Sequence, residues 1–223
     1  MTSIQSFTVE ALDPTATTAF HRAAFDLSDQ VHARASDAPT TGFRGFTVSL
    51  VVSQPSTVDS LIGTALGAGA TTLTPAKKSL WGYGAVVQAP DGTIWKVATS
   101  SKKDNGEATR RIDDLVLLLG VEDVKASKCF YVDHGLEVAR GFGSKYVEFK
   151  APPASVKLAL YGRRALAKDA GVAADGRGSH RLVINGGAEP FTDADGFEWA
   201  PTAAQSEPTS VRRQGDRPLA TGG

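Results

Sequence analysis

Few side chains in this chain are of a type that could take part in catalysis or bind a metal, and they are far apart in the sequence. His180 is of a type that serves as a general base or a metal ligand near neutral pH. A histidine at the start of a strand can equally well act only as a hydrogen-bonding group. Cys129, the single cysteine, has no flanking histidine, so we expect a packed thiol and not a nucleophile. The sequence has no Gly-x-Ser-x-Gly elbow, and its GAGA stretch at 67–70 lacks the order of a dinucleotide-binding loop.

One short sequence motif, called here the Asp-Gly phrase, occurs twice, once toward the end of each half of the chain. It is APDGTIWKVAT at 89–99 and DADGFEWAPTA at 193–203. Each copy has an Asp-Gly turn followed by a short strand with a tryptophan. Side chains alternate along a strand, so Trp95 and Trp199 should point away from the side that carries Lys96 and Ala200. We expect both tryptophans to lie in the core.

The first half alternates strands with amphipathic helices. Residues 3–11 alternate and are rich in Ile, Phe, Thr and Val, which predicts a strand. Asp13 can cap the next segment, and Pro14 suits its first turn, so a helix should begin there. The Asp91-Gly92 turn should join the last two strands as a hairpin. The expected elements are strand 3–11, helix 13–27, strands 30–35 and 45–52, helix 56–70, and strands 71–78, 83–89 and 93–99.

The second half repeats this order, which suggests a tandem repeat. Its expected elements are strand 113–121, helix 122–136, strands 144–151 and 155–162, helix 163–171, strand 180–184 and the second Asp-Gly phrase. The polar stretch at 100–111 is the best linker. We therefore predict a first lobe at 1–99, a linker at 100–111 and a second lobe at 112–203. Residues 204–223 have almost no apolar content and should form a disordered tail.

The bulk composition excludes several classes of protein. Hydrophobic residues make up 41% of the 223 residues and charged residues 22%, which is ordinary for a globular chain. Acidic and basic residues balance at 24 each, so neither nucleic acid nor an anionic membrane is an expected partner. The sequence has no long apolar run and no signal peptide, and its one cysteine suits a reducing compartment. We expect a cytoplasmic protein.

Two longer stretches resemble a known family. VDSLIGTALGAGATTLTPAKKSLWGYGAVVQAPDGTIWKVAT, at 58–99, resembles the closing half of a glyoxalase/bleomycin resistance/dioxygenase domain, of the vicinal oxygen chelate (VOC) superfamily. LGVEDVKASKCFYVDHGLEVA, at 119–139, resembles the opening half of such a domain. The resemblance implies an α+β fold of tandem βαβββ modules, in which curved mixed sheets wrap cavities.

In metal-dependent members the resemblance also implies ligands, with a His or Gln on an opening strand and a Glu on a closing strand. Mapped onto this chain, those positions hold Ser6, Val116, Phe46 or a neighbour, His180, Lys96 and Ala200. Only the histidine suits a metal, and an ammonium group at a ligand position repels a cation. We therefore expect no metal cofactor.

A shifted site in the second half is the alternative. Asp114 and Glu198 each lie two residues from a mapped position, so each should share its face. With His180 they could hold a divalent metal, or act without one as general acid and base. The protein would then be a lyase, isomerase or dioxygenase-like enzyme.

The preferred prediction is a small organic ligand bound without metal in the cavity of the curved sheet. Trp81 and Tyr83 could form aromatic walls, although core packing would explain them equally well. Lys96 could hold an anionic group, or its ammonium could simply reach solvent. A third possibility is a scaffold that acts through its surface, because fold alone does not select a function. Either a monomer or a homodimer is compatible with the sequence.

Overall fold

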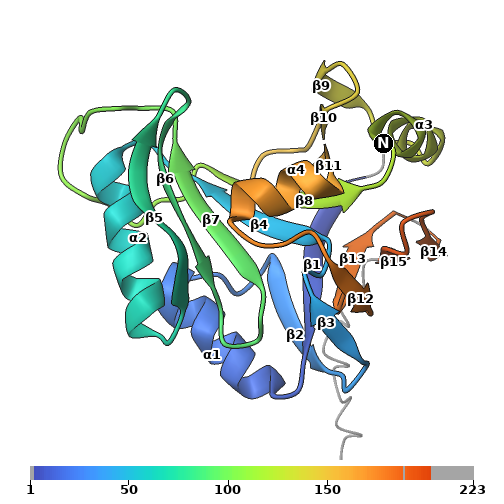
Figure 1. Cartoon of the computed structure of the whole chain (residues 1–223), viewed down its shortest axis with the longest axis horizontal. Coiled ribbons are helices and arrows are strands. Elements are labelled where there is room, and N and C mark those ends of the chain that lie inside the picture. The colour runs from blue at the N-terminus through green and yellow to red at the C-terminus, as the bar shows by residue number, and fades with distance from the viewer. Residues whose placement is uncertain (1–2, 188, 202–223) are drawn as a thin grey trace, which may run out of the picture.

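The computed structural model describes residues 3–187 and 189–201 of the chain (Figure 1). The tail predicted at 204–223 lies outside the described residues. Four helices and two main sheets form the described part, which confirms the α+β class and the curved mixed sheets. No helix within it is long and apolar enough to cross a membrane.

The larger sheet has eight strands, in the order β5-β6-β7-β4-β8-β11-β10-β9. One half comprises β4 (Phe46–Val51), α2 (Pro55–Gly67), β5 (Thr71–Ser79), β6 (Gly82–Gln88) and β7 (Ile94–Thr99). The other comprises β8 (Asp114–Val121), α3 (Val124–Asp133), β9 (Val138–Phe142), β10 (Tyr146–Phe149) and β11 (Lys157–Gly162). Each half is thus a complete βαβββ unit, and antiparallel pairing of β4 with β8 joins the two.

The smaller sheet unites the two ends of the described chain, in the order β14-β15-β13-β1-β2. Its strands are β1 (Ile4–Ala11), β2 (Val31–Ala35), β13 (Leu182–Gly186), β14 (Phe191–Thr192) and β15 (Glu198–Ala200), and α1 (Pro14–Phe25) connects the first two. A ribbon of β3 (Thr40–Gly42) and β12 (Gly176–Gly178) lies beside it. Both sheets therefore draw strands from both sides of the predicted linker, through β4–β8 and β1–β13.

Helices α1 and α3 each begin at an aspartate that caps them. Asp13 accepts a hydrogen bond from the backbone N–H of Ala16, and Asp123 accepts from Lys125 and Ala126. Each carboxylate satisfies backbone donors that a helix start leaves free. The predicted linker supplies the corresponding acceptor for α2, because Asp104 accepts from the N–H of Ser56 at 2.7 Å. Residues 100–111 are thus tied to a helix end by a specific hydrogen bond.

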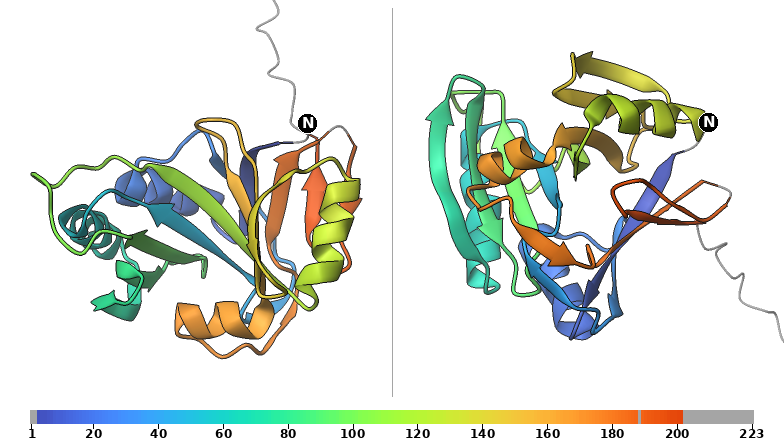
Figure 2. Two further views of the ribbon diagram at one scale, coloured as in Figure 1. Left: turned by 90° about the horizontal axis from the view of Figure 1, so that it is seen from above. Right: turned by 45° about the vertical axis from the view of Figure 1, so that its right-hand side comes forward.

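The core lies mainly between the sheets and the three helices α1, α2 and α3. Trp95 and Trp199 are buried in it, as predicted. The prediction for Cys129 is wrong, because its thiol is exposed. Helix α3 buries Val124, Ser127 and Tyr131, and this stripe does not include the cysteine. Helix α4 (Arg163–Ala170) packs against the opposite face of the eight-stranded sheet, as Figure 2 shows.

Candidate functional site

The face of the eight-stranded sheet that carries α4 (the α4 face) is the side where the curved sheet was expected to hold a ligand. Side-chain alternation separates Val86 and Ile94, which contact α4 residues, from Val87 and Trp95, which belong to the main core. Leu166, Ala167 and Ala170 of α4 complete this second, smaller core. The helix therefore fills the middle of the face, with β5–β7 on one side of it and β9–β11 on the other (Figure 2).

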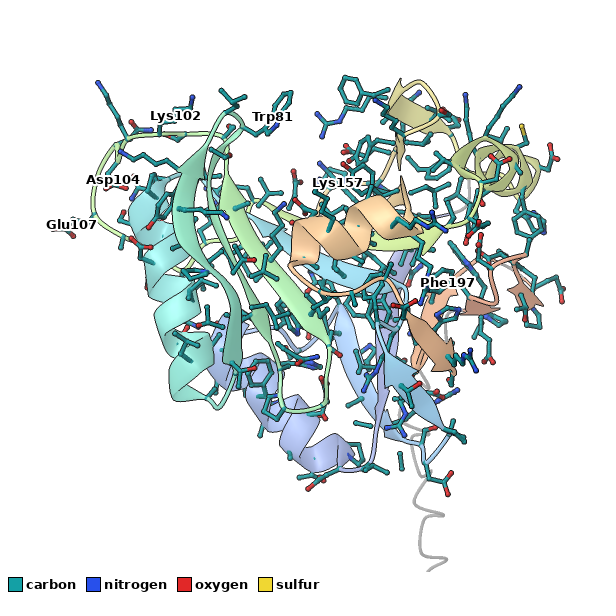
Figure 3. The ribbon with its side chains drawn as sticks, in the orientation of Figure 1. Trp81, Lys102, Asp104, Glu107, Lys157 and Phe197 are labelled. Carbon is teal, nitrogen blue, oxygen red and sulfur yellow. The ribbon has the colours of Figure 1, made fainter. Side chains whose placement is uncertain are left out.

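A cavity of about 220 Å³ remains beside α4, and the three predicted ligand-binding residues all line it. They are Trp81, Tyr83 and Lys96. Trp81 follows β5 at the tip of a hairpin and is 88% exposed (Figure 3). The Lys96 ammonium donates to Oδ2 of Asp169 on α4 at 2.6 Å. An ammonium group from β7, an indole ring from the turn and a carboxylate from α4 therefore meet at one small space.

Tyr83 borders this cavity, but its ring packs against the main core, on the face of the sheet that α2 covers. The hydroxyl donates to Oδ1 of Asp59 on α2 at 2.8 Å. This hydrogen bond to a carboxylate is the main reason that the pKa of Tyr83 is raised above its usual value. Tyr83 therefore stays neutral, and its side chain points away from the α4 face, so Trp81 is the aromatic group available to a ligand in this cavity.

The three candidate catalytic residues do not form one site. Asp114 lies on β8 and accepts from the Lys157 ammonium at 2.8 Å. Glu198 lies exposed on β15, in the other sheet. His180 precedes β13, and its ring lies between backbone carbonyl oxygens of Arg44 and Asp195, with Nε2 2.9 Å from the latter. With both nitrogens occupied, His180 fits a role in joining the sheets and has no free nitrogen for a substrate proton.

The positions that correspond to metal ligands in metal-dependent relatives do not fit a divalent ion. Ser6 accepts from the Asn185 amide at 3.1 Å within the five-stranded sheet. Val116 and Phe46 are buried and apolar, and Lys96 is a cation paired to a carboxylate. Within residues 3–187 and 189–201, no three His, Cys, Asp or Glu side chains lie close enough together to hold a metal ion. A hard or borderline cation needs oxygen, nitrogen or thiolate donors that these positions lack.

The second Asp-Gly phrase carries a closed network of buried hydrogen bonds. The Tyr131 hydroxyl of α3 donates to Oδ2 of Asp193 at 2.5 Å and accepts from Nε1 of Trp199 at 3.4 Å. Burial and the neighbouring carboxylate raise the pKa of Tyr131 far above its ordinary value. Burial likewise raises the pKa of Asp193. Every polar atom in this group has a partner.

Near the first Asp-Gly phrase lies a similar group of buried polar side chains, but several of their atoms have no hydrogen-bond partner within the described chain. His21 of α1 is 1% exposed, and its ring centre lies 5.4 Å from that of Trp95. Neither ring nitrogen of His21 has a hydrogen-bond partner among the described residues, and Nε1 of Trp95 and Oδ2 of Asp91 are also unpaired there. Burial lowers the pKa of His21 to about 4, although Asp91 opposes the shift. This group was not predicted from the sequence. The signal that could have indicated it is a polar residue directly after Phe20, in the same way that Tyr131 follows Phe130.

Comparison with solved structures gives the fold. Glyoxalase I from Zea mays superposes with a TM-score of 0.58 at 13% sequence identity, over 89% of this chain and 91% of that chain. A putative dioxygenase from Bacillus subtilis superposes with a TM-score of 0.50 at 12% identity, over 86% of this chain and 71% of that one. No family model matches the sequence, and neither does any curated protein. At this level of identity the likeness establishes the architecture.

Proposed function

We propose that this chain, which has the fold of the glyoxalase/bleomycin resistance/dioxygenase (VOC) proteins, binds a small organic ligand in the cavity beside α4. One observation carries the proposal: Trp81 and Lys96, both predicted from the sequence to bind a ligand, border the same cavity. The third predicted residue, Tyr83, also borders it, but the Tyr83 ring faces the main core. Its volume of about 220 Å³ is below the usual range of about 300–1,000 Å³ for ligand pockets. The ligand is therefore small, or only one end of it enters.

The chemistry of the lining favours an aromatic or planar molecule with a negative charge. Trp81 offers an unoccupied ring face, since the residue is 88% exposed. Lys96 offers an ammonium group whose present partner is easily replaced. The side chains of Lys96 and Asp169 are 32% and 43% exposed, and such pairs contribute only about 0–1 kcal/mol. An incoming carboxylate can therefore take the place of Asp169 at little cost.

This binding needs no metal and no catalytic step. The mapped ligand positions do not fit a divalent ion, and the acid–base candidate Asp114 lies in the eight-stranded sheet, whereas His180 and Glu198 lie in or next to the five-stranded one. The proposal is therefore sequestration or carriage of a ligand. Catalysis by those three residues has no geometric support.

Tryptophan fluorescence provides a selective test. Of the three tryptophans, Trp95 and Trp199 are buried, so a ligand in this cavity should quench mainly Trp81. We expect 1-naphthoate to quench the emission and 1-naphthamide to quench it at least about tenfold more weakly, because only the acid pairs with Lys96. Lys96→Met should weaken binding of the acid by a similar factor. Lys102→Met, at an exposed lysine of the linker, should leave it unchanged.

Trp81→Phe should abolish the quenching and leave the emission of the two buried tryptophans. Binding of 1-naphthoate to this variant can still be followed by ligand-observed NMR. The proposal fails if the acid and the amide bind equally well, or if Lys96→Met and Lys102→Met have the same effect.

A further inference from the structure

A second and larger cavity lies on the opposite face of the eight-stranded sheet, against α1. This cavity (the α1 cavity) has a volume of about 710 Å³ and lies between α1, Thr40, Ala68 at the end of α2, and the Asp-Gly turn at Pro90 and Asp91. Its size is within the range of small-molecule sites. It shares no lining residue with the cavity beside α4, so an inference about it is independent of the proposed function.

Two arginines and two aspartates give the α1 cavity its charge. Arg181 is fixed, because its Nε and Nη2 donate to the Ala38 carbonyl at 2.9 and 2.7 Å. Arg44 donates from Nη2 to the Asp91 carbonyl. Burial lowers the pKa of Arg44, Asp91 raises it, and Arg181 lowers it further, so the two guanidinium groups are near enough to repel each other. With Asp13 and Asp91 the four charges cancel.

Arg44 and Asp91, two residues of the inner wall of the α1 cavity, carry polar atoms that lie behind the wall and that the described part of the chain does not satisfy. Nη1 of Arg44 and Oδ2 of Asp91 are both buried without a hydrogen-bond partner among the described residues. The Asp91 side chain is only 3% exposed, and its other oxygen accepts from the N–H of Thr93. The nearest cationic candidate, Nε2 of His21, lies 3.9 Å away, beyond hydrogen-bonding distance. A buried donor and a buried acceptor therefore lack partners behind this wall, and a ligand in the cavity reaches them when the Arg44 and Asp91 side chains turn toward it.

An unpaired aspartate oxygen is not a general feature of the Asp-Gly turn, as the second Asp-Gly phrase shows. Asp195 holds the same place in its turn as Asp91 does in the first. Its Oδ1 accepts from the N–H of Glu122 at 2.8 Å, and its Oδ2 accepts from the Ser127 hydroxyl at 3.2 Å. The cavity at this second turn is about 360 Å³, and none of the described residues that line it is an arginine. The first turn alone combines a large cavity, two guanidinium groups and unsatisfied polar atoms.

The outer wall of the α1 cavity is apolar. Helix α1 contributes Ala16, Ala19 and Ala23, and Phe20 closes the space toward the core. Leu12, which is 75% exposed, lies at its edge. Small side chains leave room along the helix, and they offer a surface on which an aliphatic chain of a ligand can lie.

We propose that the α1 cavity binds a small amino acid or a similar organic carboxylate with an aliphatic chain. Its carboxylate pairs with the guanidinium groups of Arg44 and Arg181, its N–H donor reaches Asp91, and its chain covers the alanines of α1. Arg44 is only partly buried, so its guanidinium can turn toward the ligand. A single negative charge fits, because Asp91 and Asp13 would repel a phosphate dianion. A phosphate ion also has no chain to cover the alanines.

The test compares four probes by isothermal titration calorimetry with the full chain. Norleucine has all three features, hexanoate lacks the amine, hexanamide lacks the charge, and inorganic phosphate lacks the chain. We expect affinity to fall in that order, with hexanamide at least about tenfold weaker than hexanoate. Equal binding of hexanoate and hexanamide, or phosphate binding as tight as that of norleucine, would overturn the proposal.

Two variants, each with a control, test whether the probes bind in the α1 cavity. Arg44→Gln should weaken hexanoate at least about tenfold, and Arg164→Gln, at an exposed arginine of α4, should not. Ala19→Phe fills the cavity from an exposed helix position, so the fold should persist and binding should be lost. Unaltered norleucine affinity in Ala19→Phe with a native circular dichroism spectrum would contradict the assignment, even if Arg44→Gln weakened binding. Lys96→Met should have no effect on these probes, which separates this site from the cavity beside α4.

Discussion

The buried histidine of α1 should make the stability of the protein depend on pH in a defined window. His21 is 1% exposed, and burial lowers its pKa from 6.5 to about 4. In the unfolded chain the imidazole returns to water and titrates near its ordinary value. Between these two values the unfolded state binds a proton that the native state does not.

The sign and size of the effect follow from this difference. Because the unfolded state binds more protons, the free energy of unfolding falls as the pH decreases through the window from about 6.5 to about 4. Each unit of pKa difference corresponds to about 1.4 kcal/mol, so the full loss is about 3 kcal/mol. Above pH 7 the histidine is neutral in both states and contributes no pH dependence. Such a loss is a large part of the stability of an ordinary domain.

His21→Phe is the variant that isolates this effect. Phenylalanine keeps an aromatic ring beside Phe20 and Trp95, and it removes two buried nitrogens that have no partner within the described chain. Urea unfolding at half-unit steps from pH 4 to pH 8 should show the variant gaining about 3 kcal/mol relative to the wild type toward the acid end. Burial raises the pKa of Asp193, and this acts in the opposite direction, but it is common to both proteins and cancels in the difference.

The matched control is His32→Phe, because His32 lies exposed on β2. The difference between this control and the wild type should stay constant across the same window. The reasoning would be refuted by a His21→Phe curve that runs parallel to the wild type from pH 4 to pH 8. A wild type that became more stable toward pH 4 relative to His21→Phe would refute it as well.

Three further substitutions probe the closed network, a cap and a close backbone approach. Tyr131→Phe should cost about 1–3 kcal/mol in urea unfolding, because it leaves Oδ2 of the buried Asp193 carboxylate without a donor; a loss below about 0.5 kcal/mol would mean that another group satisfies this oxygen. Asp123→Ala removes the N-cap of α3 and should cost about 1 kcal/mol, measured the same way, whereas an unchanged midpoint would show that the cap contributes nothing. Gly82→Ala should cost more than about 1 kcal/mol, since Gly82 has a φ of +133° and an added Cβ would lie 1.9 Å from the Thr99 carbonyl oxygen; normal stability would show that the hairpin adjusts freely.

The elements that the sequence predicts well are those in which local pattern and tertiary burial agree. Helix 13–27 is observed as Pro14–Phe25, with the predicted Asp13 cap, and strand 45–52 is observed as Phe46–Val51. Strand β9 was not predicted, because four of its five residues are exposed and it has no alternating apolar pattern. Its position comes from pairing with β10. Long-range pairing of this kind leaves no signal in a short polar stretch.

The prediction of the candidate sites was limited in the same way, because the sequence does not show which strands pair over long range. Alternation along a strand assigns a side chain to a face, and it correctly separates buried Trp95 from Lys96 beside it. It does not assign the strand to a sheet. Asp114 and Glu198 were each placed on the face of a mapped ligand position, yet β8 lies in the eight-stranded sheet and β15 in the five-stranded one. The segment at 163–170 was predicted as a helix, but nothing in its pattern indicates that it covers the face where a ligand was expected.

The buried polar groups are hydrogen-bonded at the second Asp-Gly phrase and partly unpaired at the first, and one side-chain acceptor accounts for much of this difference. Asp193 occupies in the second phrase the position that Ala89 occupies in the first, and it gives the Tyr131 hydroxyl a buried partner. In the first phrase Ala89 offers no side-chain acceptor, and α1 presents His21 in the place of the tyrosine. Unsatisfied polar atoms inside a protein are costly, so they persist where another property of the site depends on them. At the first turn the proposed ligand site in the α1 cavity is such a property, because Arg44 and Asp91, which line this cavity opposite the alanines of α1, carry two of the unpaired atoms.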